Sequence, residues 1–104
     1  MHAVIGRVRL KPGRDQEALA MIGERGVAML QAMAGSIDGY WARTLGEGEM
    51  IQHSFWLFDT ERNARSAEAT FNTLRDLPDA PAEFISVDVC EVIRHAQQPA
   101  VTDA

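Results

Sequence analysis

One short segment could bind or transform an aromatic molecule. It carries aromatic and neutral hydrogen-bonding residues at every second position: Gln52, Ser54, Trp56 and Phe58. In an extended strand such residues share one face. Two aromatic walls beside two neutral polar groups suit a flat aromatic ligand, while ordinary core packing is the alternative explanation for the two rings.

His53 lies among these positions and is the candidate general base, with Ser54 as the second candidate catalytic residue. An imidazole titrates near neutral pH and could accept a phenolic proton. Strand alternation, however, puts His53 on the face of Ile51 and Phe55. That placement favours an interface over a pocket.

Other reactive residues lack the patterns that metals and cofactors require. His2 and His95 could approach one another if the first and last strands pair, but two ligands make a poor metal site. The single cysteine, Cys90, lies beside Val89 and is interpreted as a small buried hydrophobe. We therefore expect no metal and no cofactor.

Apolar periodicity predicts the elements that must position these residues. Alternation indicates four strands, at 3–10, 36–45, 50–58 and 84–95, and helical spacing indicates a helix at 15–34. A second helix follows the capping oxygens of Asp59 and Thr60 and ends before Pro78. This order is the α+β, ferredoxin-like βαββαβ arrangement, in which an antiparallel four-stranded sheet has the first strand between the third and the fourth.

Small and flexible residues are predicted to leave room between the sheet and the first helix. Gly6 and Gly26 remove bulk where the two surfaces meet, and the resulting volume could hold a ligand. Met29 and Met33 would give that volume an adaptable lining, although Met is also common core filler. The predicted substrate-binding set is Gly6, Met29, Met33, Gln52, Trp56 and Phe58.

The sheet face without helices also carries apolar side chains. Ile51, Phe55 and Leu57 point away from the predicted pocket. Exposed apolar patches of this kind usually mark an interface, which predicts a homodimer with the two sheets packed face to face. The alternative is a mixed polar surface that carries Arg7 and Arg9.

Length and charge restrict the class of protein. The chain has 104 residues, ten Lys and Arg, and fifteen Asp and Glu, with a net charge of −5. One domain at residues 1–96 with a flexible tail at 97–104 is expected, and nucleic acid is an improbable partner. The start of the chain has no signal-peptide pattern, and no apolar stretch approaches the ~18 residues that span a bilayer. We expect a cytoplasmic protein without a membrane partner.

Five local patterns carry a resemblance to a known family over about residues 1–96. They are the Arg9-Leu10-Lys11-Pro12-Gly13 step, the Ala34-Gly35 helix end, the Gly46–Glu49 loop, the run Phe55-Trp56-Leu57-Phe58-Asp59-Thr60-Glu61 and the segment Glu91-Val92-Ile93-Arg94-His95-Ala96. On these the chain resembles the antibiotic-biosynthesis monooxygenase family of dimeric α+β barrel proteins. The resemblance implies a dimer with a pocket between sheet and helices in each subunit.

The resemblance also implies a range of activities. In that family the pocket serves cofactor-free oxygenation of aromatic polyketides, quinol oxidation, haem breakdown or no known chemistry. The haem-degrading branch has an Asn where this chain has Gly6, and the polyketide-oxidising branch has an Asn and a Trp where it has Ser54 and Phe58. The leading hypothesis is a cofactor-independent monooxygenase that acts on a small hydrophobic aromatic or quinone-like molecule. The alternative is a non-catalytic dimer that binds a small ligand or serves in assembly.

Overall fold

The order of strands and helices agrees with the sequence pattern. The computed structural model describes residues 1–96, and the predicted tail at 97–104 lies outside them. The elements follow one another along the chain as β1 (His2–Leu10), α1 (Asp15–Met21), η1 (Ile22–Gly26), α2 (Val27–Ala32), β2 (Ser36–Arg43), β3 (Ile51–Phe58), α3 (Glu61–Thr73), η2 (Leu74–Asp76) and β4 (Ala82–Glu91).

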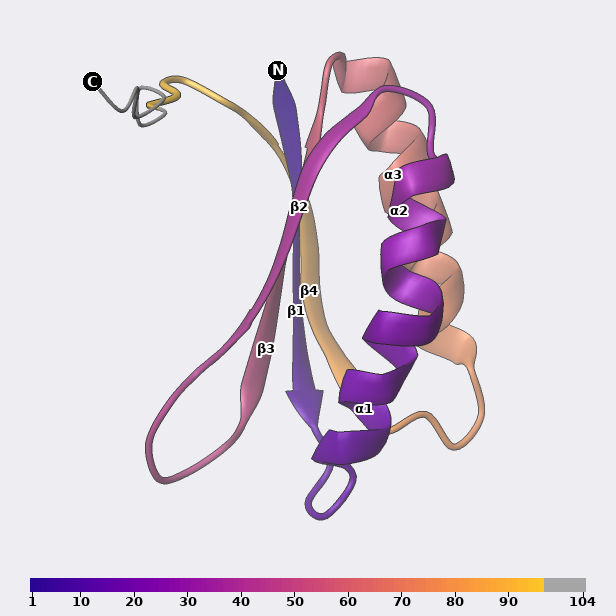
Figure 1. The fold of residues 1–104 in the computed structure, drawn as a ribbon, viewed down its shortest axis with the longest axis vertical. Helices are drawn as coiled ribbons and strands as arrows, with labels where there is room; N and C mark the ends of the chain where they lie inside the picture. Colours follow the sequence, from indigo (N-terminus) through magenta and orange to yellow (C-terminus); the bar gives the residue numbers. More distant parts are fainter. Residues whose placement is uncertain (97–104) are drawn as a thin grey trace, which may run out of the picture.

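The four strands form one antiparallel sheet in the order β2-β3-β1-β4. The predicted neighbours of β1 are therefore confirmed, and the arrangement is ferredoxin-like. All helices cover the same face of the sheet, and the other face has no covering element within the described residues (Figure 1). No described helix is long and apolar enough to cross a membrane.

The core lies between β1, β3 and α3. Val4, Trp56 and Phe58 are almost fully buried on the helix side of the sheet. Ala64 and Ala67 present a flat surface of α3 to them, and small side chains at this spacing let a helix approach a sheet closely. The predicted alternation of β3 is confirmed, since Phe55 on the opposite face is 47% exposed.

The first predicted helix is interrupted. Residues 15–34 were expected to form one continuous helix, but Ile22–Gly26 adopt a wider π-helical turn between α1 and α2. Gly23 and Gly26 lie in that turn, and glycine tolerates such departures because it has no side chain to place. The helix then ends before Gly35, which has the predicted left-handed conformation (φ +74°).

Two predicted strands extend too far. The last strand ends at Glu91 rather than at residue 95: Glu91 pairs with His2, and the amide of Val92 donates to the carbonyl of Met1 at 3.0 Å. The strand predicted at 36–45 ends at Arg43. The polar Gly46–Glu49 segment then forms the hairpin loop as predicted.

The start of α3 is capped as predicted. The Thr60 hydroxyl accepts a hydrogen bond from the Asn63 amide at 3.2 Å. The Asn63 side chain in turn donates to the Asp59 carboxylate at 2.8 Å, and this bond lowers the pKa of Asp59. Asp59 also donates its own amide to the Gly35 carbonyl at 3.0 Å, which ties the two helix ends together.

Candidate functional site

A cavity of about 230 Å³ lies between the sheet and the α1-η1 helical segment. Its walls come from four places: the helix-covered face of the sheet, the inner face of the helical segment from α1 to α2, the end of α3 with η2, and the loop before β4. The lining residues are mostly apolar, and they are Val8, Leu10, Ala18, Met21, Ile22, Arg25, Gly26, Met29, Trp41, Gln52, Ser54, Trp56, Phe71, Leu74, Leu77, Ala80, Pro81, Ala82 and Phe84.

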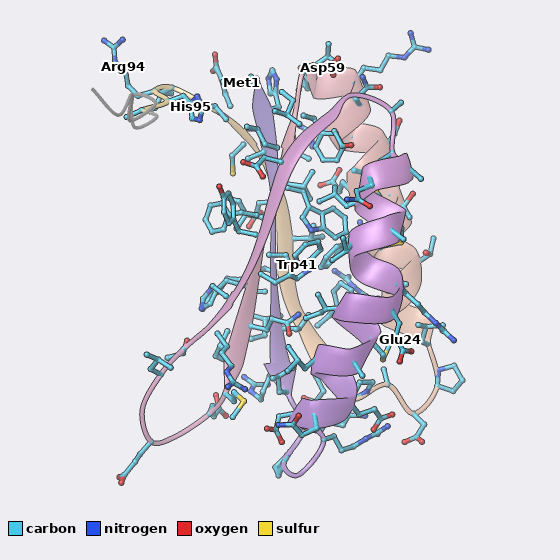
Figure 2. The ribbon with its side chains drawn as sticks, viewed as in Figure 1. Met1, Glu24, Trp41, Asp59, Arg94 and His95 are labelled. Carbon is cyan, nitrogen blue, oxygen red and sulfur yellow. The ribbon has the colours of Figure 1, made fainter. Side chains whose placement is uncertain are left out.

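Four aromatic rings form one continuous wall of this cavity. Trp41 and Trp56 meet edge to face with ring centroids 6.3 Å apart, and Trp56 meets Phe71 at 5.1 Å. Phe71 continues the series to Phe84 at 5.0 Å. Trp41 projects from β2 into the space between the sheet and the helices (Figure 2). Edge-to-face contact at these distances is the geometry that aromatic pairs prefer.

Three residues of β3 with neutral polar groups line the same cavity. The Gln52 and Ser54 side chains form no hydrogen bond with other residues in the described part of the chain, and Ser54 is 3% exposed. Trp56 is 2% exposed, and its indole Nε1 has no hydrogen-bond partner among residues 1–96. A buried donor without a partner costs stability, so it is a group that a ligand could satisfy.

Some of the predicted binding residues line the cavity. Gln52, Ser54 and Trp56 share the helix-covered face of β3, and Met29 reaches the cavity from α2. Gly26 lies across from Trp41: a Cβ atom added there would stand 3.7 Å from the Trp41 ring, in ordinary van der Waals contact, so a larger side chain would enter the space beside that ring.

Other predicted binding residues have a packing role. Gly6 does not line the cavity, because the Phe71 ring occupies the space that a Gly6 side chain would fill. Phe58 is fully buried in the core, and Met33 packs against that core. For these residues the structure places protein atoms where a ligand was expected.

His53 does not reach the cavity. It lies on the uncovered face of β3, beside Phe55, and its Nε2 is 3.3 Å from the Thr44 hydroxyl. The sheet itself separates His53 from Ser54, so the two candidate catalytic side chains point in opposite directions. Strand alternation had predicted this separation.

The sequence alone did not indicate Trp41, Phe84 or Arg25 as site residues. Trp41 is brought to the cavity by strand pairing, which sets it opposite Ser54 in the register of β2 and β3. Phe84 arrives through the pairing of β4 with β1, opposite Val8. Register depends on contacts between distant segments, and no local pattern encodes it. For Arg25 a signal was present, since it interrupts the apolar stripe of the helix.

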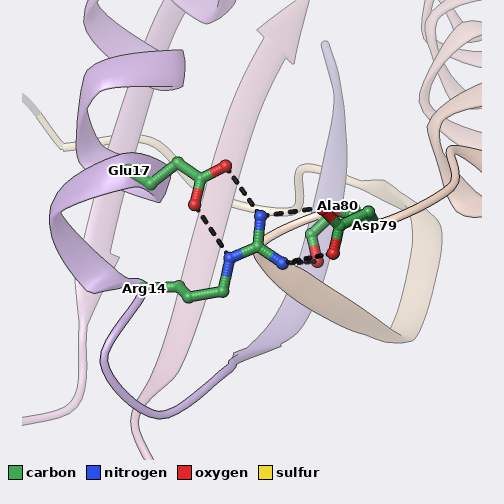
Figure 3. A network of polar contacts seen from close by, with 4 residues as sticks. All are labelled: Arg14, Glu17, Asp79 and Ala80. Carbon is green, nitrogen blue, oxygen red and sulfur yellow. Dashed lines mark hydrogen bonds and ion pairs between the residues drawn. The ribbon is translucent and has the colours of Figure 1, made fainter.

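Hydrogen bonds from an arginine fix the loop before β4, which forms one wall of the cavity. Arg14 precedes α1, and its guanidinium bonds Glu17 at 2.7 and 2.8 Å on one side (Figure 3). On the other side it reaches the Asp79 carboxylate and the Asp79 carbonyl, both at 2.9 Å. These contacts fix the loop that carries Leu77, Ala80 and Pro81 into the cavity wall. The hydrogen bond from Arg14 also lowers the pKa of Glu17.

The lining offers binding groups but no general base. Among the described lining residues there is no carboxylate, imidazole or thiol, and Arg25 is the charged member. Within residues 1–96 no three His, Cys, Asp or Glu side chains gather as metal ligands. The arrangement can therefore bind an aromatic ring and donate hydrogen bonds to an oxygen atom carried by that ring.

Comparisons with known proteins support the fold. Neither family models nor curated protein sequences match the chain. Among solved structures, a Bacillus cereus protein described as a candidate antibiotic biosynthesis monooxygenase is 14% identical, with a TM-score of 0.58 over 95% of this chain and 97% of that chain. A Nitrosomonas europaea protein of unknown function is 20% identical, with a TM-score of 0.55 over 96% and 95% of the two chains.

A third structure carries a bound molecule. It is a monooxygenase of Streptomyces coelicolor in complex with the ligand nanaomycin D, 11% identical to this chain, with a TM-score of 0.57 over 95% of this chain and 92% of that chain. The protein is therefore an α+β domain with the fold of antibiotic biosynthesis monooxygenase structures. The resemblance seen in the sequence is confirmed at the level of the fold.

Proposed function

We propose that the cavity binds a small, flat aromatic or quinone-like molecule and promotes its cofactor-independent oxygenation. The observation that carries the proposal is the wall of four edge-to-face rings beside the unpartnered Trp56 N–H. A stacked ring system would contact this wall, and a carbonyl or hydroxyl oxygen on it would accept the indole hydrogen bond.

The size of the cavity limits the ligand. Its volume of about 230 Å³ is below the range of roughly 300–1,000 Å³ that is usual for small-molecule sites. A bicyclic ring system would fill it, and a tricyclic one such as a hydroxyanthrone would leave its third ring outside the cavity. The substrate therefore has no more than three fused rings.

The proposed reaction uses the substrate as its own reductant. The anion of a hydroxyanthrone or quinol gives electrons to molecular oxygen inside the apolar cavity. For a ring methylene, one oxygen atom becomes the new carbonyl oxygen, and the other leaves as water with the two methylene hydrogens. A quinol has no such methylene: it passes two electrons and two protons to oxygen, and the products are the quinone and hydrogen peroxide. The protein contributes burial, orientation and hydrogen-bond donors. Because the described lining has no base, the substrate would enter already ionised.

The assembly that we propose is a homodimer with two sheets packed through their uncovered faces. Phe55 and Tyr40 are 47% and 65% exposed on that face, and each lies directly opposite the other in the register of β2 and β3. Burying such rings against a second copy would remove a contiguous apolar patch from water.

A matched pair of glycine variants tests the proposal. Gly26→Leu would place a side chain into the cavity, whereas Gly23→Leu makes the same change in the same helical turn at a position with open space around it. With a hydroxyanthrone or a naphthoquinol, wild type and Gly23→Leu should consume oxygen, and Gly26→Leu should not. A saturating ligand should raise Tm by about 10 °C in the first two only.

The same experiment distinguishes oxygenation from the second candidate function, which is binding of a small ligand without catalysis. The missing base among the described lining residues favours a non-catalytic protein that binds a small ligand. Ligand-dependent stabilisation without oxygen uptake would support that reading. If none of these compounds turned over and none changed Tm of the wild type, both functions would be rejected.

A further inference from the structure

The cavity carries one full charge at its rim. Arg25 belongs to η1, and its side chain is exposed, yet it contributes to the lining of an otherwise uncharged cavity. Within the described residues the Arg25 guanidinium forms no ion pair and no side-chain hydrogen bond. Its donors are therefore available to a ligand.

The position of Arg25 is unusual for a surface cation. Ala18, Ile22 and Met29 line the same cavity at helical spacing, and Arg25 falls on their stripe. An apolar residue would be expected there if the face served only to pack against the sheet. The π-helical turn at Ile22–Gly26 surrounds this position, and such turns frequently occur at functional sites.

A second polar feature belongs to the same cavity. The buried Trp56 N–H, contributed by β3, lacks a partner among residues 1–96, as described above. The cavity is thus lined by a guanidinium from the helix, by Trp56 with its unpartnered N–H from the sheet, and by the aromatic wall to which Trp56 belongs.

We infer that the cavity selects aromatic anions, in which a carboxylate or phenolate oxygen pairs with Arg25 and the ring lies against Trp41 and Trp56. The inference rests on the proposed function, because it names the substrate class of the same cavity. A guanidinium binds an oxygen anion through parallel N–H donors, and Arg is better suited to this than Lys. In a chain of net charge −5 the overall field repels anions, so a local cation is needed to admit one.

Calorimetric titration with two matched probes tests the inference. The probes are 2-naphthoate and 2-acetylnaphthalene, which share the bicyclic ring and a carbonyl oxygen and differ in charge. Wild type should bind naphthoate about tenfold more tightly. Arg25→Gln should remove that preference and leave the affinity for acetylnaphthalene unchanged. Arg62→Gln removes the same charge from α3, outside the cavity, and should preserve the preference.

Each outcome has a separate meaning. Equal binding of both probes to wild type, or the same loss of preference in Arg25→Gln and Arg62→Gln, would overturn the role of Arg25 while the aromatic site stands. Failure of both probes to bind wild type would overturn the proposed function itself. Loss of acetylnaphthalene binding in Arg25→Gln would show that the substitution damages the cavity. That result would also overturn the proposal that Arg25 acts only by attracting anions.

Discussion

Arg14 and Asp79 lie 65 positions apart in the sequence, and the guanidinium of the first holds the carboxylate of the second at 2.9 Å. This contact joins the start of the helical segment to the loop that closes the cavity. The cavity wall thus depends on one side chain that does not line it. Most exposed ion pairs contribute little, but Arg14 adds bonds to the loop carbonyls of Asp79 and Ala80.

Replacing Arg14 should loosen this loop. In Arg14→Gln, hydrogen exchange of the backbone amides of Leu77, Asp79 and Ala80 should become several-fold faster, because the side-chain tether is lost while the core stays intact. Arg65→Gln breaks surface pairs with Glu61 and Glu68 on α3, and it should leave these amides unchanged. Equal exchange of the three amides in wild type and Arg14→Gln would show that the tether has no effect.

The hydrogen bond between Arg14 and Glu17 should make the stability of the protein depend on pH in the acid range. The Arg14 hydrogen bond holds the pKa of Glu17 below its ordinary value of 4.5 in the folded state. A lowered folded-state pKa stabilises the protein above the unfolded pKa, and the stabilisation is lost as pH falls through the folded pKa. The difference in Tm between wild type and Arg14→Gln should therefore be constant above pH 4.5 and shrink as the pH falls below that value. A difference that stays constant as the solution is acidified would contradict the assignment.

Gly6 should be intolerant of any side chain. The Phe71 ring lies where a Cβ atom of residue 6 would be, with its Cε2 atom only 2.9 Å away. Gly6→Ala should lower the free energy of unfolding by about 1–3 kcal/mol through overpacking. Gly23→Ala, at an open helical position, should instead raise it by up to ~1 kcal/mol. Chemical denaturation of the two variants gives the comparison, and a neutral Gly6→Ala would refute the close packing.

Trp56→Phe separates packing from hydrogen bonding. The variant keeps a ring between Trp41 and Phe71 but removes the unpartnered N–H. We expect a loss of about 1–2 kcal/mol in the free energy of unfolding, because a smaller ring leaves a gap. Affinity for 2-acetylnaphthalene should fall about fivefold, since the carbonyl loses its donor. Retained affinity would indicate that the indole N–H does not contact the ligand.

The proposed dimer depends on the uncovered sheet face. Wild type should sediment at twice the chain mass of 11.5 kDa, and Phe55→Glu should sediment as a folded monomer because the charge disrupts the apolar patch. Leu19→Glu, at a helix position that is 55% exposed, is the matched control and should remain dimeric. A wild type that stays monomeric at micromolar concentration would contradict the proposed assembly.

Local pattern predicted the fold well because the main signals are periodic. Alternation in β3 correctly separated Trp56 from Phe55, and the Thr60 cap marked the start of α3. The errors arose where contacts between distant segments determine where an element ends or whether it is continuous. The last strand stops at Glu91, where its pairing with β1 ends, and the π-helical turn interrupts a pattern that looked continuous.

The site was only partly predictable for the same reason. Gln52, Ser54 and Trp56 could be grouped from strand alternation alone. Gly6 was interpreted as free volume, but the contact with Phe71 joins residues that are far apart in sequence and fills that volume. Trp41 reaches the cavity only through the register of β2 against β3.

The central claim is that an aromatic molecule occupies the cavity beside Trp56. The most direct measurement is a ¹H–¹⁵N spectrum in which the two indole N–H signals, from Trp41 and Trp56, are followed during titration with 2-acetylnaphthalene. The account predicts a saturable shift of the Trp56 indole signal in wild type and Gly23→Leu, and no shift in Gly26→Leu. A Trp56 signal that stays fixed in wild type while resonances of the uncovered sheet face move would contradict it.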